Sequence, residues 1–335
     1  MATIEETKTQ PLDRSFNLSK FIRKNGTQLG IFSVFILLWV IFILAAPDTF
    51  LSPQIYYAFM STIPFFAIIA MPLTITVIAG EIDLSFPAIM AIGMVAFLLT
   101  YEVVESVWLA SFAALLIGLF AGWLNGTIVV RFGIPSLVAT IGTQFFWRGA
   151  VLVLSQGKSG TLVYAKETLL HPILVGKVFD VFPMQMIWLI VITILCWILL
   201  NRTRFGAHVY LIGDNAESAK LMGVNTGRVR IRTFMLVGVI SAFAGILASL
   251  HVTYFWPSLG DGYLLRTLAS VFLGGTSVFG GVGTIFGSFI GAFIIGAIEA
   301  ATVAIGLTGF WTQLIYGLII VLSVTMHAFV RRKIE

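Results

Sequence analysis

The sequence has little cysteine, histidine or charge, and each shortage excludes a class of protein. The single cysteine, Cys196, lies in an apolar run, so no disulfide framework or cysteine-based metal site is expected. Charged residues make up 10% of the chain, against about 25% in soluble globular domains, which argues against an ordinary water-soluble enzyme. The four histidines are too scattered to indicate a metal site or a catalytic centre: His171, His208, His251 and His327.

Apolar residues are abundant instead, at 59% of the 335 residues. A membrane-spanning helix needs about 20 consecutive apolar residues, and ten runs approach that length. These expected spans are 29–46, 55–79, 85–101, 106–130, 134–155, 185–200, 231–252, 264–280, 283–306 and 310–330. The sequence therefore predicts an all-α polytopic membrane protein with about ten transmembrane helices, in which a transmembrane domain (29–330) follows a polar tail (1–28) and precedes a basic tail (331–335).

The first run follows five basic residues, so residues 29–46 have two interpretations. A signal peptide is one of them, but its apolar core is usually about 7–15 residues long, and this run has about 18 and is followed by further spans. We therefore interpret it as the first span. With both termini in the cytoplasm, fifteen Lys and Arg residues lie inside and three lie outside, which satisfies the positive-inside rule. The net charge of +5 thus indicates orientation and not nucleic-acid binding.

Two glycine-containing breaks interrupt the apolar pattern, at residues 80–87 and 274–283. Irregular backbone at membrane depth is tolerated where protein or a water-filled cavity satisfies its polar groups, and paired interruptions often mark a transport path. Tight cytoplasmic turns between spans remain the alternative. Glycine also recurs every fourth residue, which predicts close helix packing: Gly118, Gly122 and Gly126, and Gly283, Gly287 and Gly291.

The largest inside loop, residues 201–232, contains a short helix-forming stretch at 216–223. Asp214 or Asn215 is available as its N-cap, and Gly223 ends it. A surface helix that touches lipid headgroups is one interpretation. However, Glu217, Ser218 and Ala219 with Gly223 resemble the Glu-Ala-Ala…Gly signature of ABC importer permeases, and the string from Gly213 to Val224 resembles its ribose/xylose/arabinose-type version.

Three further stretches resemble the same family in order and spacing: 79–85 (AGEIDLS), 122–149 and 273–283 (LGGTSVFGGVG). With the coupling-type loop and the basic tail, the resemblance covers about residues 30–330. It implies a type II ABC importer-like permease of the bacterial inner membrane that works as a homodimer or heterodimer. It also implies an extracytoplasmic substrate-binding protein and cytoplasmic ATPase subunits as partners. Residues implied to couple to the ATPase are Gly213, Asp214, Asn215, Glu217, Ser218, Ala219 and Gly223.

The chain itself has no ATPase motif. Its only Gly-Lys-Ser, 157–159, lies in an expected outside loop, and Leu152 stands where a phosphate-binding loop needs glycine. We therefore expect no cofactor and no catalytic residue in this subunit, with ATP bound by its partner.

Polar residues within the spans are candidates for the solute path, because their burial in a membrane is costly. The candidates are Asp83, Asn125, Thr140, Gln144, Phe145, Thr276, Ser277 and Glu299. Three of them have a structural alternative: Asp83 with Glu81 as a helix cap, Phe145 as a packing residue, and Glu299 as the partner of Arg266. Arg148 and Arg266 are expected to extend toward the outer surface. Six outside carboxylates, among them Glu102 and Glu105, form either an acidic docking surface or ordinary solvated loops.

Three function classes compete. An importer permease driven by a partner's ATP cycle fits the coupling-type loop. An ion-coupled secondary transporter would need an acidic relay, for which only Asp83 and Glu299 are candidates. A membrane enzyme would need a nucleophile–base set that the sequence lacks. The resemblance favours a monosaccharide, pentose, hexose or polyol, as the solute, with a nucleoside or a furanone-type signal molecule as the alternative.

Overall fold

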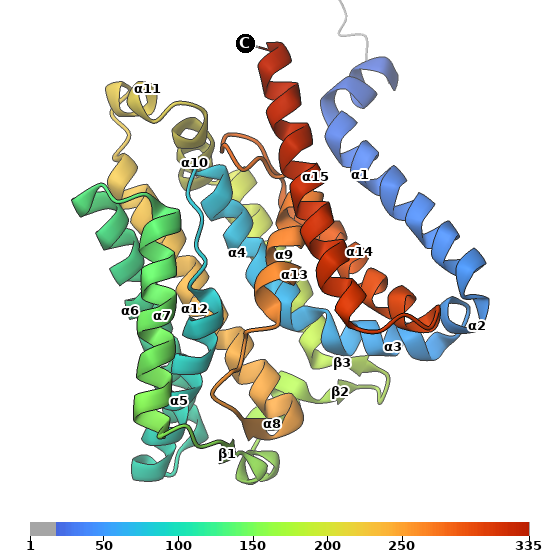
Figure 1. Cartoon of the computed structure of the whole chain (residues 1–335). Coiled ribbons are helices and arrows are strands. Elements are labelled where there is room, and N and C mark those ends of the chain that lie inside the picture. Colours follow the sequence, from blue (N-terminus) through green and yellow to red (C-terminus); the bar gives the residue numbers. More distant parts are fainter. Residues whose placement is uncertain (1–17, 335) are drawn as a thin grey trace, which may run out of the picture.

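The computed structural model describes residues 18–334, and Figure 1 shows long helices that run between two ends of the molecule. Seven described helices are long and apolar enough to cross a membrane. They are α1 (Leu18–Ala45), α5 (Phe86–Val104), α6 (Val107–Phe132), α7 (Ser136–Ser155), α9 (Met184–Arg202), α12 (Thr226–Val252) and α14 (Ile285–Ala304). The predicted all-α polytopic architecture is confirmed.

The second expected span is a bent pair of helices, α3 (Pro53–Thr62) and α4 (Pro64–Ile78), which meet at 53° and make an eighth candidate span. The bend lies at Pro64, the first residue of α4, whose ring prevents the helix from continuing unbroken. Pro72 is accommodated inside α4. All fifteen residues of α4 are buried, so this helix forms the centre of the core.

Two shorter apolar helices occupy the remaining expected spans, α13 (Tyr263–Leu273) and the apolar part, Phe310–Met326, of α15 (Phe310–Ile334). The prediction of a full span at 264–280 is corrected, because α13 has 11 residues and is about 16 Å long at 1.5 Å per residue. Glycine explains the early end: α13 stops at Gly274, and Gly275 follows with a positive φ of 80°.

Short elements mark the two ends of the molecule. One end carries α10 (Arg204–Asp214) and α11 (Ala216–Leu221), and in Figure 1 both α1 and α15 have their described chain termini there, as expected for the cytoplasmic side. The first helix begins at Leu18, inside the stretch expected as a tail; residues 1–17 and 335 of the predicted tails lie outside the described residues. The connections at the opposite end contain α2 (Pro47–Phe50), β1 (Gly160–Thr161), η1 (Val163–Glu167), α8 (Leu170–Val175), β2 (Lys177–Val178), β3 (Phe182–Pro183) and β4 (Tyr254–Phe255).

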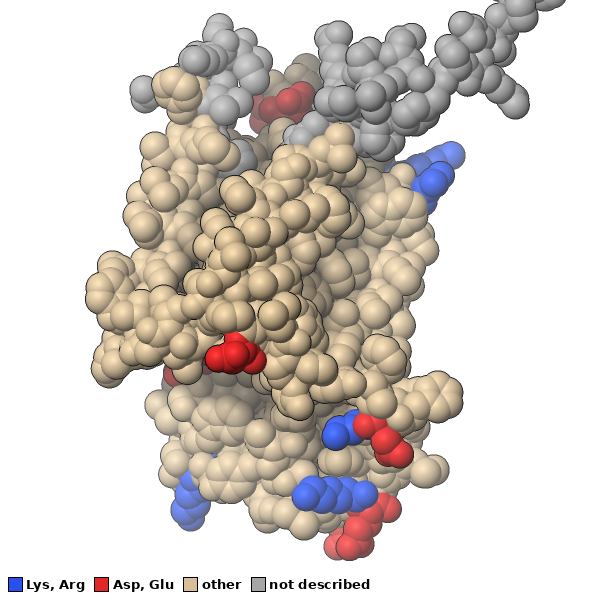
Figure 2. Space-filling view, turned by 90° about the vertical axis from the view of Figure 1, so that its right-hand side faces the viewer, with Lys and Arg blue, Asp and Glu red and all other residues tan. Residues whose placement is uncertain are grey.

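Charged side chains on the face in Figure 2 gather toward its two ends, and a broad uncharged surface separates them. This is the distribution that a bilayer requires of a spanning protein, because charge at the bilayer centre is costly. The burial of the helices differs widely. We compare the most apolar stretch of each helix: 72% of the residues in that stretch are buried in α12, and 6% are buried in α1. Thus α1 lies at the periphery.

The predicted close packing at the glycine repeats is confirmed. A Cβ atom built on Gly122 would lie 2.3 Å from the carbonyl oxygen of Phe234, so α6 and α12 approach each other at backbone distance. In the second repeat, a Cβ atom on Gly291 would lie 2.3 Å from the carbonyl oxygen of Ser270, which brings α14 equally close to α13. Small residues allow such contacts between helices in a membrane.

Candidate functional site

The first chain break, residues 80–85, leaves the cytoplasmic end of α4 and runs back into the protein in an extended form before α5 begins (Figure 1). Its backbone is held by side chains of α7. The Ile82 N–H donates to the Ser136 hydroxyl at 3.0 Å, and the Leu84 N–H donates to the Thr140 hydroxyl at 3.1 Å. These bonds satisfy amides that have no helical partner, as non-helical backbone within a membrane protein requires.

The start of α5 continues this pattern. The Ala88 N–H donates to Oε1 of Gln144 at 3.2 Å, so a side chain of α7 caps the helix from outside. The supporting side chains are spaced by four residues along α7, which places them on one face. They are Ser136, Thr140, Gln144 and Arg148, named below as the α7 polar stripe.

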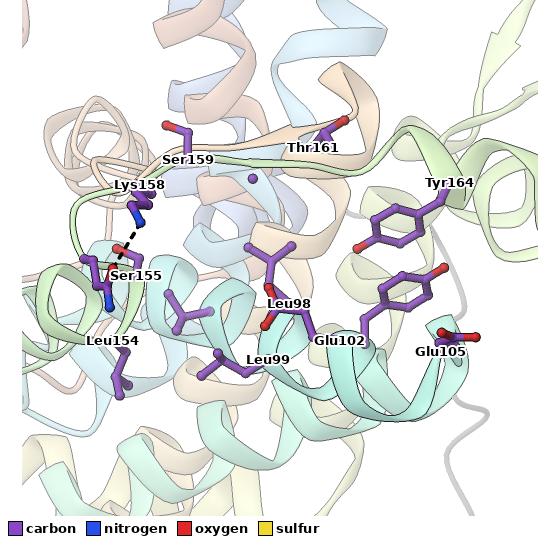
Figure 3. A pocket seen from close by; sticks show the side chains of 14 residues that line it. Leu98, Leu99, Glu102, Glu105, Leu154, Ser155, Lys158, Ser159, Thr161 and Tyr164 are labelled. Atoms are coloured by element: carbon purple, nitrogen blue, oxygen red, sulfur yellow. Dashed lines mark hydrogen bonds between the residues drawn. The ribbon is translucent and has the colours of Figure 1, made fainter.

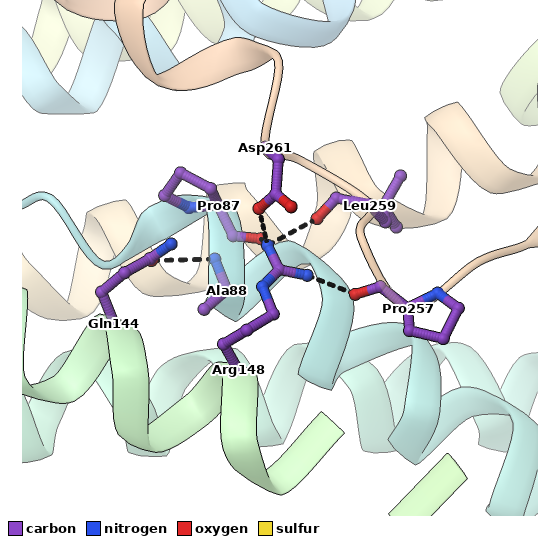
Figure 4. Close-up of polar contacts among 7 residues, drawn as sticks. All are labelled: Pro87, Ala88, Gln144, Arg148, Pro257, Leu259 and Asp261. Carbon is purple, nitrogen blue, oxygen red and sulfur yellow. Dashed lines mark hydrogen bonds and ion pairs between the residues drawn. The ribbon is translucent and has the colours of Figure 1, made fainter. Parts of the chain in front are cut away.

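Arg148 ends the α7 polar stripe at a buried cluster of carbonyl groups (Figure 4). Its guanidinium donates to the carbonyl oxygens of Leu259 at 3.1 Å and Pro87 at 3.4 Å, and also to the carbonyl oxygen of Pro257 and to the carboxylate of Asp261. Instead of extending to the outer surface, as expected from sequence, Arg148 joins α7 to the start of α5 and to the loop before α13.

Asp83 is fully buried within the first break and contacts Ser85 and Asn125. Its Oδ1 accepts the Ser85 N–H at 2.8 Å and the Ser85 hydroxyl at 2.6 Å. The Asn125 amide donates to the Ser85 hydroxyl at 2.6 Å and lies 3.4 Å from Oδ2 of Asp83. The structure thus brings Asp83 and Asn125 together, while Thr140 and Gln144 of α7 bond to Leu84 of the same break and to Ala88 at the start of α5. The Asn125 carbonyl oxygen is buried and has no protein partner among the described residues.

Glu81, at the start of the same break, lies 3.1 Å from Nε of Arg230 on α12. Only 7% of the Glu81 side chain is exposed, so this ion pair is largely screened from water. The structure therefore places Glu81 against α12 and not at the N-terminus of α5, where Ser85 occupies the capping position. The predicted capping role of Glu81 is corrected.

The second break, residues 274–284, is held mainly by its own backbone. The Ser277 N–H donates to the Val282 carbonyl oxygen at 2.9 Å, and the Ser277 hydroxyl accepts the Phe279 N–H at 3.2 Å. Thr276 is fully buried, and its hydroxyl has no hydrogen-bond partner in the described part of the chain. Thr276 and Ser277 therefore lie in this second break, while Asp83 and Asn125 lie at the first.

The two breaks meet each other and α10 at one point, which we name the glycine junction. The Gly281 N–H donates to the Ile78 carbonyl oxygen at 2.9 Å, which joins the second break to the end of α4. Gly213 lies against both groups, because a Cβ atom there would be 1.7 Å from that oxygen and 2.4 Å from the Gly281 nitrogen. The Tyr210 hydroxyl donates to the Gly283 carbonyl oxygen at 2.9 Å. α10 is therefore in contact with the ends of both breaks.

The predicted short helix is α11, and Asn215 caps it by accepting the Ser218 N–H at 2.9 Å. Glu217 lies exposed in its first turn, and Ala219 is buried. After the helix, Gly223 adopts a positive φ of 84°, as its predicted terminating role requires. The predicted helix at 216–223 is thus observed at 216–221.

Two predicted path residues lie away from the breaks. Phe145 on α7 is 73% exposed on the outside of the helix bundle. Glu299 on α14 accepts a hydrogen bond from Arg266 at 2.7 Å, which is the ion pair that the sequence left open. This pair lines a cavity of about 450 Å³ between α3, α4 and α14.

Four residues of this region were missed from the sequence: Ser136, Tyr210, Leu221 and Arg230. Ser136 had a detectable signal, since it begins the four-residue spacing of the α7 polar stripe. Tyr210 and Arg230 had none, because each acts across a contact between segments distant in sequence. Leu221 is 90% exposed and the adjacent Met222 is 67% exposed. Their exposure can be recognised only from the folded structure.

Comparison with known proteins gives the family. The model of a family described as "Branched-chain amino acid transport system / permease component" matches residues 55–324. The autoinducer 2 import system permease proteins LsrC of Yersinia pestis (strain Pestoides F) and Yersinia pseudotuberculosis serotype O:3 (strain YPIII) are both 32% identical to this chain over 305 residues, which is 90% of this chain and 84% of theirs. No solved structure matches. The chain belongs to this permease family and is a multi-pass permease subunit of the sugar-type ABC importers of the bacterial inner membrane.

Proposed function

We propose that this permease carries a monosaccharide or a related polyol into the cell. A separate ATPase binds the segment from Gly213 to Gly223 and drives the conformational change of the permease. The observation that carries the proposal is the glycine junction, because there α10 contacts the ends of both chain breaks. A rigid-body movement of α10 and α11 would change the packing of both breaks together, and packed interfaces of this kind tend to switch between discrete arrangements.

The surface proposed for the ATPase is the tip of α11. Leu221 and Met222 present apolar side chains at the cytoplasmic end, beyond the spanning helices, and Glu217 lies exposed one helical turn before Leu221. Exposed apolar side chains rimmed by polar groups are typical of sites where another protein binds. The Asn215 N–H donates to the Leu211 carbonyl oxygen of α10 at 3.0 Å, and Ala219 of α11 is buried, so a force on the tip of α11 would reach α10 directly.

The proposed solute path uses polar groups that the described part of the protein leaves without partners. The Asn125 carbonyl oxygen and the Thr276 hydroxyl are buried and unpaired, one beside each break. Buried polar groups of this kind are costly unless water or a ligand binds them, and the hydroxyl groups of a sugar supply both donors and acceptors. Asp83 lies beside Asn125 at the first break, which Thr140 and Gln144 hold from α7, and Ser277 follows Thr276 in the second break. Phe145 and Glu299 would act elsewhere on the route, and uptake that is unchanged in Glu299→Gln would remove Glu299 from it.

The coupling proposal is tested with two variants that change equally exposed apolar residues at opposite ends. Leu221→Asp should abolish co-purification of the ATPase and solute-stimulated ATP hydrolysis, because it places a charge in the proposed contact. Phe179→Asp, also 90% exposed but on the outer β2–β3 turn, should leave ATPase binding unchanged. Normal ATPase binding by Leu221→Asp would contradict the proposal.

Two further variants test the segment itself. Glu217→Arg reverses a charge on the exposed first turn of α11, and Gly223→Pro replaces a residue whose φ of 84° proline cannot adopt. Both should abolish solute-stimulated ATP hydrolysis while the permease is still inserted in the membrane. Coupled transport at the wild-type rate in both variants would show that the ATPase binds another surface.

A furanone-type signal molecule is the second candidate solute, and the names of the Yersinia relatives favour it. A vesicle system that contains the permease, its ATPase and its substrate-binding protein distinguishes the two. ATP-dependent uptake of a labelled pentose or hexose supports the first proposal, whereas uptake of the furanone alone supports the second. Suppression of either uptake by a competing nucleoside would instead indicate that the solute is a nucleoside.

A further inference from the structure

A cavity of about 640 Å³ opens at the outer end of the protein, away from both breaks and from α10 (Figure 3). Its walls are the last turns of α5 and α7, and its roof is the chain from Lys158 to Thr161 together with Tyr164. Tyr164 stacks on Tyr101 of α5, with ring centroids 3.8 Å apart and planes 7° apart, which fixes the roof to the wall. None of the importer's proposed steps uses this cavity.

The lining is divided into an apolar part and a charged part. Leu98, Leu99 and Leu154 form the apolar part, and Glu102 and Lys158 belong to the charged part. Strongly exposed apolar side chains lie beside it in sequence, among them Val103 at 84% and Val153 at 76%. A bilayer would cover such residues. A bilayer that covers them would place the cavity at its outer boundary, with the leucines toward the acyl chains and the charges toward the headgroups.

The charged groups have no counterions in the described part of the chain. No cationic nitrogen there lies within 4.0 Å of the Glu102 or Glu105 carboxylate. The Lys158 ammonium donates to Oε1 of Gln156 at 3.1 Å and pairs with no described carboxylate. In the view of Figure 3, Glu102 lies between Lys158 on one side and Tyr164 on the other. These three charged side chains are exposed, so a ligand that carries both a cationic and an anionic group could pair with them.

Two uncharged groups also lack partners. The Ser155 hydroxyl and the Tyr164 hydroxyl are buried and make no hydrogen bond in the described part of the chain, and both residues line the cavity. Burial, with the nearby Tyr101 and Glu102, raises the pKa of Tyr164, so the phenol remains a proton donor. A ligand with acceptor oxygens would satisfy both hydroxyls.

We propose that this cavity binds an aminophospholipid of the outer leaflet, of the phosphatidylethanolamine type. The ammonium group would lie between the carboxylates of Glu102 and Glu105, and the phosphate would bind Lys158 and the free hydroxyls. One acyl chain would follow the leucines. A basic segment of a soluble protein would match the carboxylates but would leave Lys158 and the leucine wall unmatched. An anionic lipid without an amine would leave the carboxylates of Glu102 and Glu105 unmatched.

The test compares lipids in nanodiscs that contain the purified permease. Thermal unfolding and native mass spectrometry are measured with phosphatidylethanolamine, with phosphatidylglycerol and with phosphatidylcholine at equal mole fractions. The wild type should unfold at the highest temperature with phosphatidylethanolamine and retain it preferentially. Removal of both negative charges in E102Q/E105Q should weaken this binding by roughly tenfold, which corresponds to about 1.4 kcal/mol.

The matched control is Glu167→Gln, an exposed carboxylate of η1 that does not line the cavity, and it should retain the lipid preference. Lys158→Gln should reduce the preference, because it removes the phosphate partner. An unchanged preference in E102Q/E105Q would overturn the proposal. So would loss of substrate-binding-protein capture in that variant with its lipid preference intact, which would assign the cavity to protein docking.

Discussion

The two chain breaks satisfy the hydrogen bonds of their non-helical backbone in different ways. Residues 80–85 are extended, and their amides bond to side chains from another helix, chiefly Ser136 and Thr140. Residues 274–284 turn back on themselves, and their amides bond mainly to nearby carbonyl groups, with three positive-φ glycines in the turn. The first break should therefore be sensitive to polar substitutions on α7, and the second to substitution of its own glycines. The glycine junction should be sensitive in both respects, because both breaks end there.

The largest effect is expected from Gly213→Val, which tests whether the breaks act as one unit. The added side chain would overlap the Ile78 carbonyl oxygen and the Gly281 nitrogen, both backbone atoms that cannot move independently. We expect loss of transport and of solute-stimulated ATP hydrolysis together. Gly142→Val on α7, where a Cβ atom meets nothing within 4 Å, is the control and should retain both. Transport by Gly213→Val at the control rate would contradict the junction.

The next effect distinguishes glycines inside the junction from those beside it. Gly280 and Gly80 both have positive φ, 85° and 82°, so alanine at either position costs about 1–2 kcal/mol of backbone strain. At Gly280 a Cβ atom would also lie 3.0 Å from the Gly213 carbonyl oxygen, whereas at Gly80 it meets nothing within 4 Å. Gly280→Ala should therefore lower both the unfolding temperature and the coupling of ATP hydrolysis to solute. Gly80→Ala should lower mainly the unfolding temperature, and equal coupling defects would contradict this distinction.

The sequence predicts the parts of this molecule that depend on local pattern. Apolar length places the spans, the four-residue glycine spacing predicts that α6 packs closely against another helix, and Asn215 with Gly223 predicts the ends of α11. Each signal depends on residues within a few turns of one helix, so no knowledge of the tertiary contacts is needed.

The parts that the sequence does not predict depend on contacts between distant segments. Residues 80–85 read equally well as a turn or as a path element, and only the bonds from Ser136 and Thr140, more than 50 residues away, make the segment extended. The glycine junction likewise joins positions 78, 213 and 281. The sequence favours an outward position for Arg148. Its carbonyl partners near residue 259 become its neighbours only in the folded chain, so the sequence does not reveal them.

A smaller effect is expected from Thr140→Val, which tests the side-chain support of the first break. This change removes the acceptor for the Leu84 N–H, and an unsatisfied buried donor costs about 1–3 kcal/mol. Thr143→Val is the matched control, because within the described residues the Thr143 hydroxyl donates only to the Thr140 carbonyl oxygen of its own helix. Thermal unfolding in nanodiscs should show a larger loss for Thr140→Val, with recovery in Thr140→Ser. Equal losses at the two positions would show that the α7 polar stripe does not support the break.

The smallest effect concerns the contact between the helices that lead into and out of the two breaks. The Thr74 hydroxyl on α4 lies 2.6 Å from the Ser288 hydroxyl on α14, and both residues are fully buried. Thr74 also bonds the Ala70 carbonyl oxygen of its own helix, so single variants lose more than the contact itself. A double-mutant cycle of Thr74→Val and Ser288→Ala, followed by unfolding in mixed detergent micelles, isolates the contact. We expect a coupling energy of about 0.6 kcal/mol, the average for hydrogen bonds between membrane helices. A value near zero would mean that α4 and α14 are joined by packing alone, and that the two breaks communicate only through the glycine junction.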